Sequence, residues 1–188
     1  MMKAKHTQYP EKWTGLKPTR FNKYRSWINN QKPGICGTYV SAVLLHDAYL
    51  HTYGLNISKT TLLTGLKTVI DETFAYRGTF PWDLWHGLNV VLKYNPDYHA
   101  RMSFIPDKKV VELLDRPDPL PVAVGTARLL GSSYENHWVV VYAYGYDPNG
   151  KLYFKAYDNH GRSAAILPAS QTFGCVWLQN KKIKKDKR

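Results

Sequence analysis

The two halves of this 188-residue chain follow different hydrophobic patterns, and this change restricts the fold more than any other feature. From Gly37 to Tyr53 the apolar residues recur at helical spacing, and Gly54 follows as a typical helix-ending glycine. Ser58 is a suitable N-cap for the next helix. Further helices are expected over residues 59–71, 81–93 and 107–114. The first half of the chain is therefore predicted to be helical.

The second half consists of short runs rich in Val, Tyr, Phe and Trp that lack helical spacing, which is typical of β-strands. Strands are expected over residues 120–127, 137–146, 151–158 and 173–178, with a short one over 163–167. The Asp147-Pro148-Asn149-Gly150 segment predicts a hairpin turn, so its flanking strands should pair antiparallel. Helices followed by an antiparallel sheet indicate an α+β fold.

Composition places the chain among ordered proteins, because hydrophobic residues make up 44% and charged residues 21% of it. Its length suits one domain. No run approaches 18 apolar residues, so we expect no transmembrane helix. No apolar segment follows the basic N-terminus, so we expect no intact secretion signal. The chain as it stands is interpreted as cytoplasmic, or as secreted if a leader has been removed.

The net charge of +12 is concentrated at the two ends of the chain. Residues 1–25 hold seven Lys or Arg and one Glu, and residues 181–188 hold six Lys or Arg and one Asp. We therefore predict a domain over 26–180 between a basic N-terminal arm and a basic C-terminal tail. The body is nearly neutral, so no specific nucleic-acid partner is expected. The ends either aid solubility or make weak contact with an anionic surface.

Cys36 is the strongest candidate for a reactive residue. It follows the Pro33-Gly34 turn and stands at the start of the longest apolar helix, where unpaired N–H groups and the helix dipole favour an anion. A thiol in that place should have a lowered pKa. Gly37 would let the backbone approach a substrate, and the Gln31 amide could join the Cys36 N–H in an oxyanion hole. The alternative is a buried cysteine without chemistry.

A thiol nucleophile needs a base, and His137 stands where a polar loop meets an apolar strand. Asp158 is the candidate to orient its imidazole, because the hairpin returns the next strand beside His137. Alternation along that strand puts Asp158 on the same face as Phe154 and Ala156. Asn159 is the alternative third member, although its face is the opposite one. A plain turn residue is the other interpretation of Asp158.

The order Gln31, Cys36-Gly37, His137-Trp138-Val139-Val140 and Asp158 resembles the papain-like cysteine peptidases. It looks closest to the branch that includes the bacteriocin-processing, double-glycine-leader peptidases. The resemblance spans roughly residues 28–178. It implies a helical half with the nucleophile at a helix start, packed on an antiparallel sheet. It also implies a Cys-His-Asp triad that cleaves a peptide or amide bond. Asn159 stands where that branch usually has Pro, and the Gln31-to-Cys36 spacing is one residue short.

The sequence leaves several functions open. The same triad would serve acyl-transfer and deamidating relatives, and the same scaffold would serve a binding or immunity module without turnover. A nucleic-acid binder that uses surface Tyr and Trp is a third, weaker interpretation. We expect no cofactor and no metal, since zinc-binding and nucleotide-binding motifs are missing from the sequence. The expected partner is a peptide or protein substrate, the expected state is a monomer, and Cys175 is expected to be a buried hydrophobe.

Overall fold

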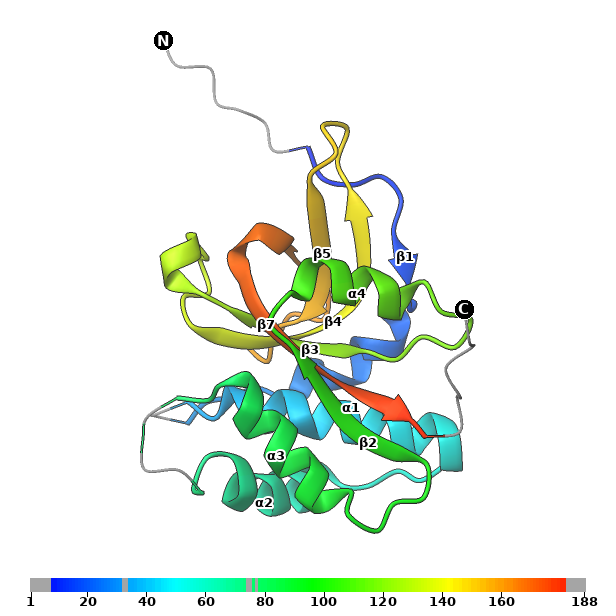
Figure 1. Ribbon diagram of the computed structural model, residues 1–188, viewed down its shortest axis with the longest axis vertical. Helices are drawn as coiled ribbons and strands as arrows, with labels where there is room; N and C mark the ends of the chain where they lie inside the picture. Colours follow the sequence, from blue (N-terminus) through cyan, green and yellow to red (C-terminus); the bar gives the residue numbers. More distant parts are fainter. Residues whose placement is uncertain (1–7, 32–33, 74–75, 77, 182–188) are drawn as a thin grey trace.

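Helices dominate the first half of the molecule and strands the second, which confirms the predicted α+β class (Figure 1). The computed structural model describes residues 8–31, 34–73, 76 and 78–181. The helices are α1 (Cys36–Tyr53), α2 (Lys59–Ile70), α3 (Pro81–Val91) and α4 (Pro106–Leu114), with 3-10 helices η1 (Pro18–Ser26), η2 (Arg128–Leu130) and η3 (Ala169–Gln171). The strands are β1 (Thr14–Gly15), β2 (Tyr98–Ser103), β3 (Val122–Thr126), β4 (His137–Tyr146), β5 (Leu152–Tyr157), β6 (Ala165–Pro168) and β7 (Thr172–Asn180).

Within the described residues, seven strands form one antiparallel sheet in the order β2-β7-β3-β4-β5-β6, with β1 added to β4. Strand β4 lies at its centre and changes partners along its length. Its first half, from His137 to Val141, pairs with β3, whereas Ala143 and Tyr144 pair with β1. On its other side β4 pairs with β5, with a register shift between Val141 and Ala143.

The sheet is the middle layer of the molecule. Helices α1, α2 and α3 lie on one face and α4 lies on the other (Figure 1). Alternate residues of β4 therefore enter different cores. Val140 and Tyr142 pack with α1, and Val139 and Val141 pack with α4. Because both faces are covered, β4 is apolar almost throughout, and its first residue is held rigidly at the sheet's end.

The N-terminal arm differs from the prediction. Residues 14–26 belong to the folded body, since β1 joins the sheet and η1 inserts Phe21 and Tyr24 fully into the main core. The Phe21 ring stacks on Tyr142 at 4.3 Å between centroids. The basic residues of η1 had suggested an arm, but its two aromatic residues anchor it. The domain therefore begins well before residue 26. Residues 1–7 and 182–188 of the two expected basic ends lie outside the described residues.

Two further details were not predicted. Strand β2 carries no clear alternation in its sequence, yet it pairs with β7 at the edge of the sheet. Strand β5 buries both faces, because Tyr153 and Tyr157 are as inaccessible as Phe154 and Ala156. Burial therefore does not distinguish the face of β5 that carries Phe154 and Ala156 from the opposite face. No helix in the described part of the chain is long and apolar enough to cross a membrane.

Candidate active site

Cys36 is the first residue of α1 and is partly buried. Its sulfur lies near the start of β4, where the backbone N–H of Trp138 favours the ionised thiol and so lowers its pKa. Helix α1 packs on β4 in the main core, and every α1 residue from Gly37 to Ala48 is buried. The sheet and α1 thus bring residues a hundred positions apart in the sequence into contact, and they place Cys36 beside the residue that follows His137.

His137 is the first residue of β4 and is 7% exposed. Its Nε2 lies 2.8 Å from the carbonyl oxygen of Asp158. A carbonyl oxygen only accepts hydrogen bonds, so Nε2 carries the proton and Nδ1 keeps a free lone pair. Burial lowers the pKa of His137 to about 4, more than the Asp158 carbonyl raises it. The imidazole is therefore neutral at pH 7, which is the form that accepts a proton.

Both residues line one cavity of about 520 Å³. The Gln31 side chain, which is exposed, also lines it. The other lining residues provide amide, hydroxyl, imidazole, aromatic and small groups: Asn29, Gly34, Gly78, Thr79, Phe80, Thr126, Ala127, Asn136, Trp138, His160 and Phe173. Among the described lining residues there is no Asp, Glu, Lys or Arg. The cavity thus joins a thiol to a neutral imidazole in surroundings without formal charge.

Asp158 contacts His137 through its backbone rather than through its carboxylate. One carboxylate oxygen accepts from the N–H groups of His160 and Arg162, each at 2.9 Å, and the other accepts from the Tyr134 hydroxyl at 2.9 Å. Strand β5 ends at Tyr157, so Asp158 lies in the following turn and alternation along the strand does not place its side chain. The carboxylate shapes the turn that presents the carbonyl to the imidazole.

Asn159, the alternative third member, is fully buried next to the same imidazole-bearing strand. Its backbone has a φ of 45°, in the left-handed region that Asn tolerates better than most residues. Its side-chain amide donates to the Trp138 carbonyl at 2.8 Å, and its Oδ1 is buried without a hydrogen-bond partner. Asn159 therefore ties the turn after β5 to β4 and holds one unused acceptor near the site.

The thiol does not have the lowered pKa that its place at a helix start suggested. Burial is the largest effect and raises the pKa of Cys36, and the charge of Asp71 raises it further. The N–H groups of Trp138, Gly37 and Cys36 itself act in the opposite direction. Desolvation of a thiolate outweighs these dipoles. Burial therefore favours the neutral form of both the thiol and the imidazole.

Gly37 has a packing role that differs from the expected one. A side chain at Gly37 would come within 2.7 Å of the Thr79 hydroxyl and 3.0 Å of Leu84. Glycine thus allows the segment before α3 to lie against the start of α1. In that segment the backbone carbonyl of Thr79 accepts a hydrogen bond from the Trp138 indole N–H at 2.9 Å. This close approach builds the cavity wall beside Cys36.

Sequence reasoning missed two residues that shape the site. His160 lies in the loop after β5, and its ring stacks on that of His137 at 4.3 Å between centroids; its place two residues after Asp158 was the available signal. The side chain of Asn29, which precedes α1 in the sequence, lies beside the start of that helix. Its amide oxygen accepts a hydrogen bond from the Ile35 N–H. With the amide in the opposite orientation, that oxygen accepts from both Ile35 and Cys36 at 3.2 Å. In this orientation the Cys36 N–H is engaged by Asn29.

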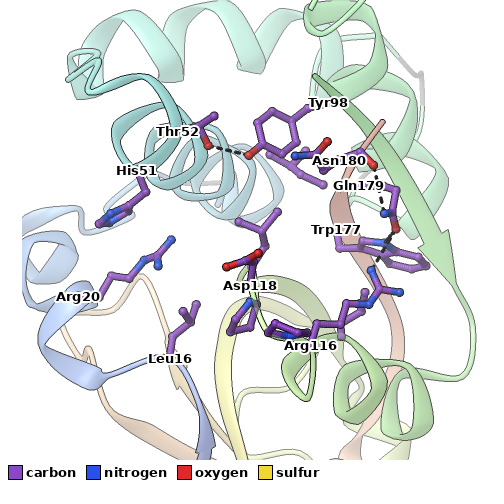
Figure 2. A pocket seen from close by; sticks show the side chains of 15 residues that line it. Leu16, Arg20, His51, Thr52, Tyr98, Arg116, Asp118, Trp177, Gln179 and Asn180 are labelled. Atoms are coloured by element: carbon purple, nitrogen blue, oxygen red, sulfur yellow. Dashed lines mark hydrogen bonds between the residues drawn. The ribbon is translucent and has the colours of Figure 1, made fainter. Parts of the chain in front are cut away.

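A second cavity, of about 480 Å³, lies between the end of α1, β7 and the loop after α4 (Figure 2). Its two arginines are bound to neighbouring side chains. Arg20 binds the buried carboxylate of Asp47 through two nitrogens, at 2.8 and 2.6 Å, and Arg116 contacts Gln179.

Cys175 lies elsewhere, fully buried in β7, with a free thiol whose pKa burial raises to about 12. In the described ranges no three His, Cys, Asp or Glu form a metal-binding group.

No family model matches this chain, and no curated protein matches it. Among solved structures, it is similar to a recombinant stem bromelain precursor, with a TM-score of 0.49 and 12% sequence identity. That match covers 93% of this chain and 78% of the other.

Proposed function

We propose that this chain is a thiol-dependent hydrolase of the papain-like type that cleaves a peptide or amide bond, with Cys36 as nucleophile and His137 as base. One observation carries the proposal. Cys36 and His137 line the same cavity, and the hydrogen bond between His137 Nε2 and the Asp158 carbonyl leaves the Nδ1 lone pair to accept a proton. A thiol and a neutral base that open onto a common cavity are what acyl transfer requires.

The reaction begins from a neutral pair. As the sulfur attacks the carbonyl carbon, the thiol proton passes to Nδ1 of His137, and a C–S bond forms. The protonated imidazole then gives that proton to the leaving nitrogen as the C–N bond breaks. Water then attacks the thioester while Nδ1 takes its proton; the C–O bond forms, the C–S bond breaks, and the imidazolium returns the proton to the leaving sulfur. Throughout, the Asp158 carbonyl holds Nε2–H and so fixes the ring, and the Gln31 amide is the proposed oxyanion donor.

The uncharged lining favours an uncharged segment of substrate at the scissile bond, because a buried unpaired charge is costly. In this proposal Asp158 acts through its carbonyl, so the triad is Cys36, His137 and the Asp158 backbone. The narrower resemblance to the bacteriocin-processing branch rests on the sequence motifs alone.

The proposal is tested with a fluorescent peptidyl electrophile and mass-spectrometric mapping of the labelled residue. We expect rapid labelling of Cys36, slowed at least about tenfold in His137→Gln, since loss of a positioned base costs on that order or more. Glutamine keeps a donor for the Asp158 carbonyl, so the variant should fold. Labelling no faster than that of a free thiol, and equal in both proteins, would favour a binding module without turnover.

A peptide library with a mass-spectrometric readout then identifies the reaction. Cleavage, deamidation and transfer to an amine give different mass changes, and all three would pass through the same thioester. We expect cleavage to dominate and to disappear in Cys36→Ala. Products of transfer alone would mean that an amine, rather than water, accepts the acyl group. Products of deamidation alone would mean that a side-chain amide is the bond attacked. In both cases Cys36 would remain the nucleophile.

A further inference from the structure

The ring of His137 is held by one hydrogen bond within the described residues. Its Nε2–H donates to the Asp158 carbonyl at 2.8 Å. The last side-chain torsion of a histidine has a broad, roughly two-fold energy profile, so one contact at the edge of the ring does not fix its plane. A half turn about that torsion would put carbon atoms where the two nitrogens lie, and the base would be lost. A well-oriented base therefore needs a further restraint on the ring.

Two aromatic rings pack against the His137 ring and form a three-ring cluster with it. The His160 ring stacks on it at 4.3 Å between centroids, with 28° between the planes. The Tyr134 ring lies 5.7 Å away and is nearly parallel, at 13°. Tyr134 and His160 also contact each other, at 6.2 Å. His137 is buried and His160 is exposed, so His160 is the outer ring of the cluster.

The Asp158 carboxylate holds the two rings that flank His137. One oxygen accepts from the His160 N–H and the other from the Tyr134 hydroxyl, each at 2.9 Å. The same residue closes its own turn, since its N–H donates to the Arg162 carbonyl at 3.1 Å. Such side-chain-to-backbone bonds are typical of Asp in tight turns. Asp158 thus binds the imidazole through its carbonyl and the rings beside it through its carboxylate.

Stacking restrains the His137 ring without occupying its nitrogens. A nitrogen lone pair of imidazole lies in the plane of the ring, whereas a stacked ring lies against its face. Near-parallel aromatic rings attract each other beyond the area that they bury. Cys36, His137 and His160 all line one cavity, so the stack forms part of the wall onto which the thiol opens. His160 can therefore fix the base and leave its lone pair accessible.

We propose that His160 is a positioning residue whose ring fixes the plane of the His137 imidazole, so that Nδ1 stays in the orientation needed to accept a proton. This inference rests on the proposed function for its purpose, since a base is needed only if Cys36 attacks a substrate. The contact acts on the face of the imidazole, so the flat ring of His160 matters and its nitrogens do not. A phenylalanine should therefore replace His160, and an alanine should not.

The first measurement is the rate at which the fluorescent peptidyl electrophile labels Cys36 in the full chain. In His160→Ala we expect the maximal rate to fall about fivefold or more, since aromatic pairs contribute on that order. The half-saturating concentration should stay within about twofold, because His160 acts through His137 and not on the probe. His160→Phe should keep the wild-type rate within about twofold. His51→Ala, which removes an exposed histidine of the second cavity, is the matched control.

The second measurement needs neither substrate nor probe. Carbon-13 relaxation of the His137 ring reports how far the imidazole moves on the picosecond-to-nanosecond timescale. In His160→Ala we expect a lower order parameter for this ring than in the wild type, and in His160→Phe an unchanged one. His160 is exposed, so these variants should fold. His160→Asn is a second variant without the ring, and asparagine suits a turn.

An unchanged order parameter, or an unchanged maximal rate, in folded His160→Ala would overturn the inference. So would a loss that His160→Phe fails to restore, or a change in the half-saturating concentration alone, because His160 would then contact the probe itself. Labelling that does not depend on His137 would refute the proposed function, and the order parameter alone would then decide on the contact between the rings. Labelling that is slowed in His137→Gln but equal to wild type in His160→Ala would retain the proposed function and refute the role of His160.

Discussion

The molecule contains two cavities of similar size that differ in what their polar groups do. The cavity at Cys36, of about 520 Å³, has no acidic or basic residue among its described lining apart from its histidines. The cavity in Figure 2, of about 480 Å³, is lined by Arg20, His51, Arg116 and Asp118. In the first, a thiol and an imidazole lone pair open onto the cavity. In the second, the arginines are bonded to neighbouring side chains.

The comparison teaches that volume alone does not identify a site. The groups around the second cavity hold elements of the fold together. Arg20 links η1 to α1 through Asp47, and the Thr52 hydroxyl bonds to the Tyr98 hydroxyl at 2.6 Å to link α1 to β2. The groups around the first cavity are held by the fold, since the Asp158 carbonyl binds the His137 imidazole and Cys36 is the first residue of α1, but they keep reactive atoms available. We therefore expect substitutions in the two cavities to have opposite consequences.

The largest expected effect is on turnover. Cys36→Ala should reduce cleavage of an identified peptide about a thousandfold or more, since the nucleophile has no substitute in the cavity. The matched change in the second cavity is Thr52→Val, which replaces a hydroxyl by a methyl group of similar size. It should leave turnover nearly unchanged. Steady-state kinetics on both variants checks this. Equal losses in the two variants would mean that the first cavity is no more catalytic than the second.

The next effect is on stability against pH. Because burial lowers the pKa of His137 to about 4 from its ordinary value of 6.5, the unfolded chain binds more protons between these values. Stability should be complete above pH 6.5 and decline towards pH 4, by on the order of 3 kcal/mol for this one group. Urea unfolding of the wild type and His137→Gln at several pH values measures the difference. His51→Gln, at a partly exposed site of the second cavity, should change the slope less.

Arg20→Met provides the opposite test in the second cavity. Asp47 is fully buried, so loss of its bidentate partner leaves its charge with only the longer contact to His51 Nε2 at 3.5 Å. We expect a loss of about 2 kcal/mol, reduced by the partial exposure of Arg20, with turnover retained below the unfolding transition. Lys23→Met on the same 3-10 helix is the control, since Lys23 is exposed. A stability equal to wild type in Arg20→Met would contradict the structural role of this cavity.

The smallest effect concerns Asp158. The imidazole contacts its carbonyl, which any residue provides, so Asp158→Asn should keep turnover within about threefold of wild type. The Asn side chain can still accept from the His160 N–H and preserve the turn. A drop of a hundredfold or more would show that the carboxylate itself orients His137. A larger loss in Asn159→Ala than in Asp158→Asn would instead point to the buried amide.

The elements and their order could be predicted from the sequence because local signals mark them. Ser58 accepts from the Thr61 N–H as an N-cap, Gly54 adopts a left-handed φ of 67° after α1, and the turn at 147–150 joins β4 to β5. Strand β2 could not be found, because its pairing with β7 is set by tertiary contact rather than by its own pattern. Nor could η1 be assigned to the folded body, because its basic residues indicated an exposed segment although two of its aromatic residues lie in the core.

At the candidate site, residue types could be predicted but not their electrostatics. The sequence indicates a cysteine at a helix start and a histidine at a strand start, and both lie there. The pKa of the thiol depends on burial and on the charge of Asp71. Asp71 lies at the end of another helix, far from Cys36 in the sequence, so no local pattern around Cys36 indicates it. The same holds for Asp158, whose contact with His137 runs through a backbone atom that sequence does not distinguish.

The central proposal is that His137 is a neutral base for Cys36, and nitrogen-15 NMR of the histidine side chains tests it directly. At pH 7 we expect the His137 resonances of the Nε2–H tautomer, and we expect them to move when Cys36 is alkylated while the His51 resonances stay in place. An Nδ1–H tautomer at His137, or resonances that do not respond to alkylation of Cys36, would contradict the account.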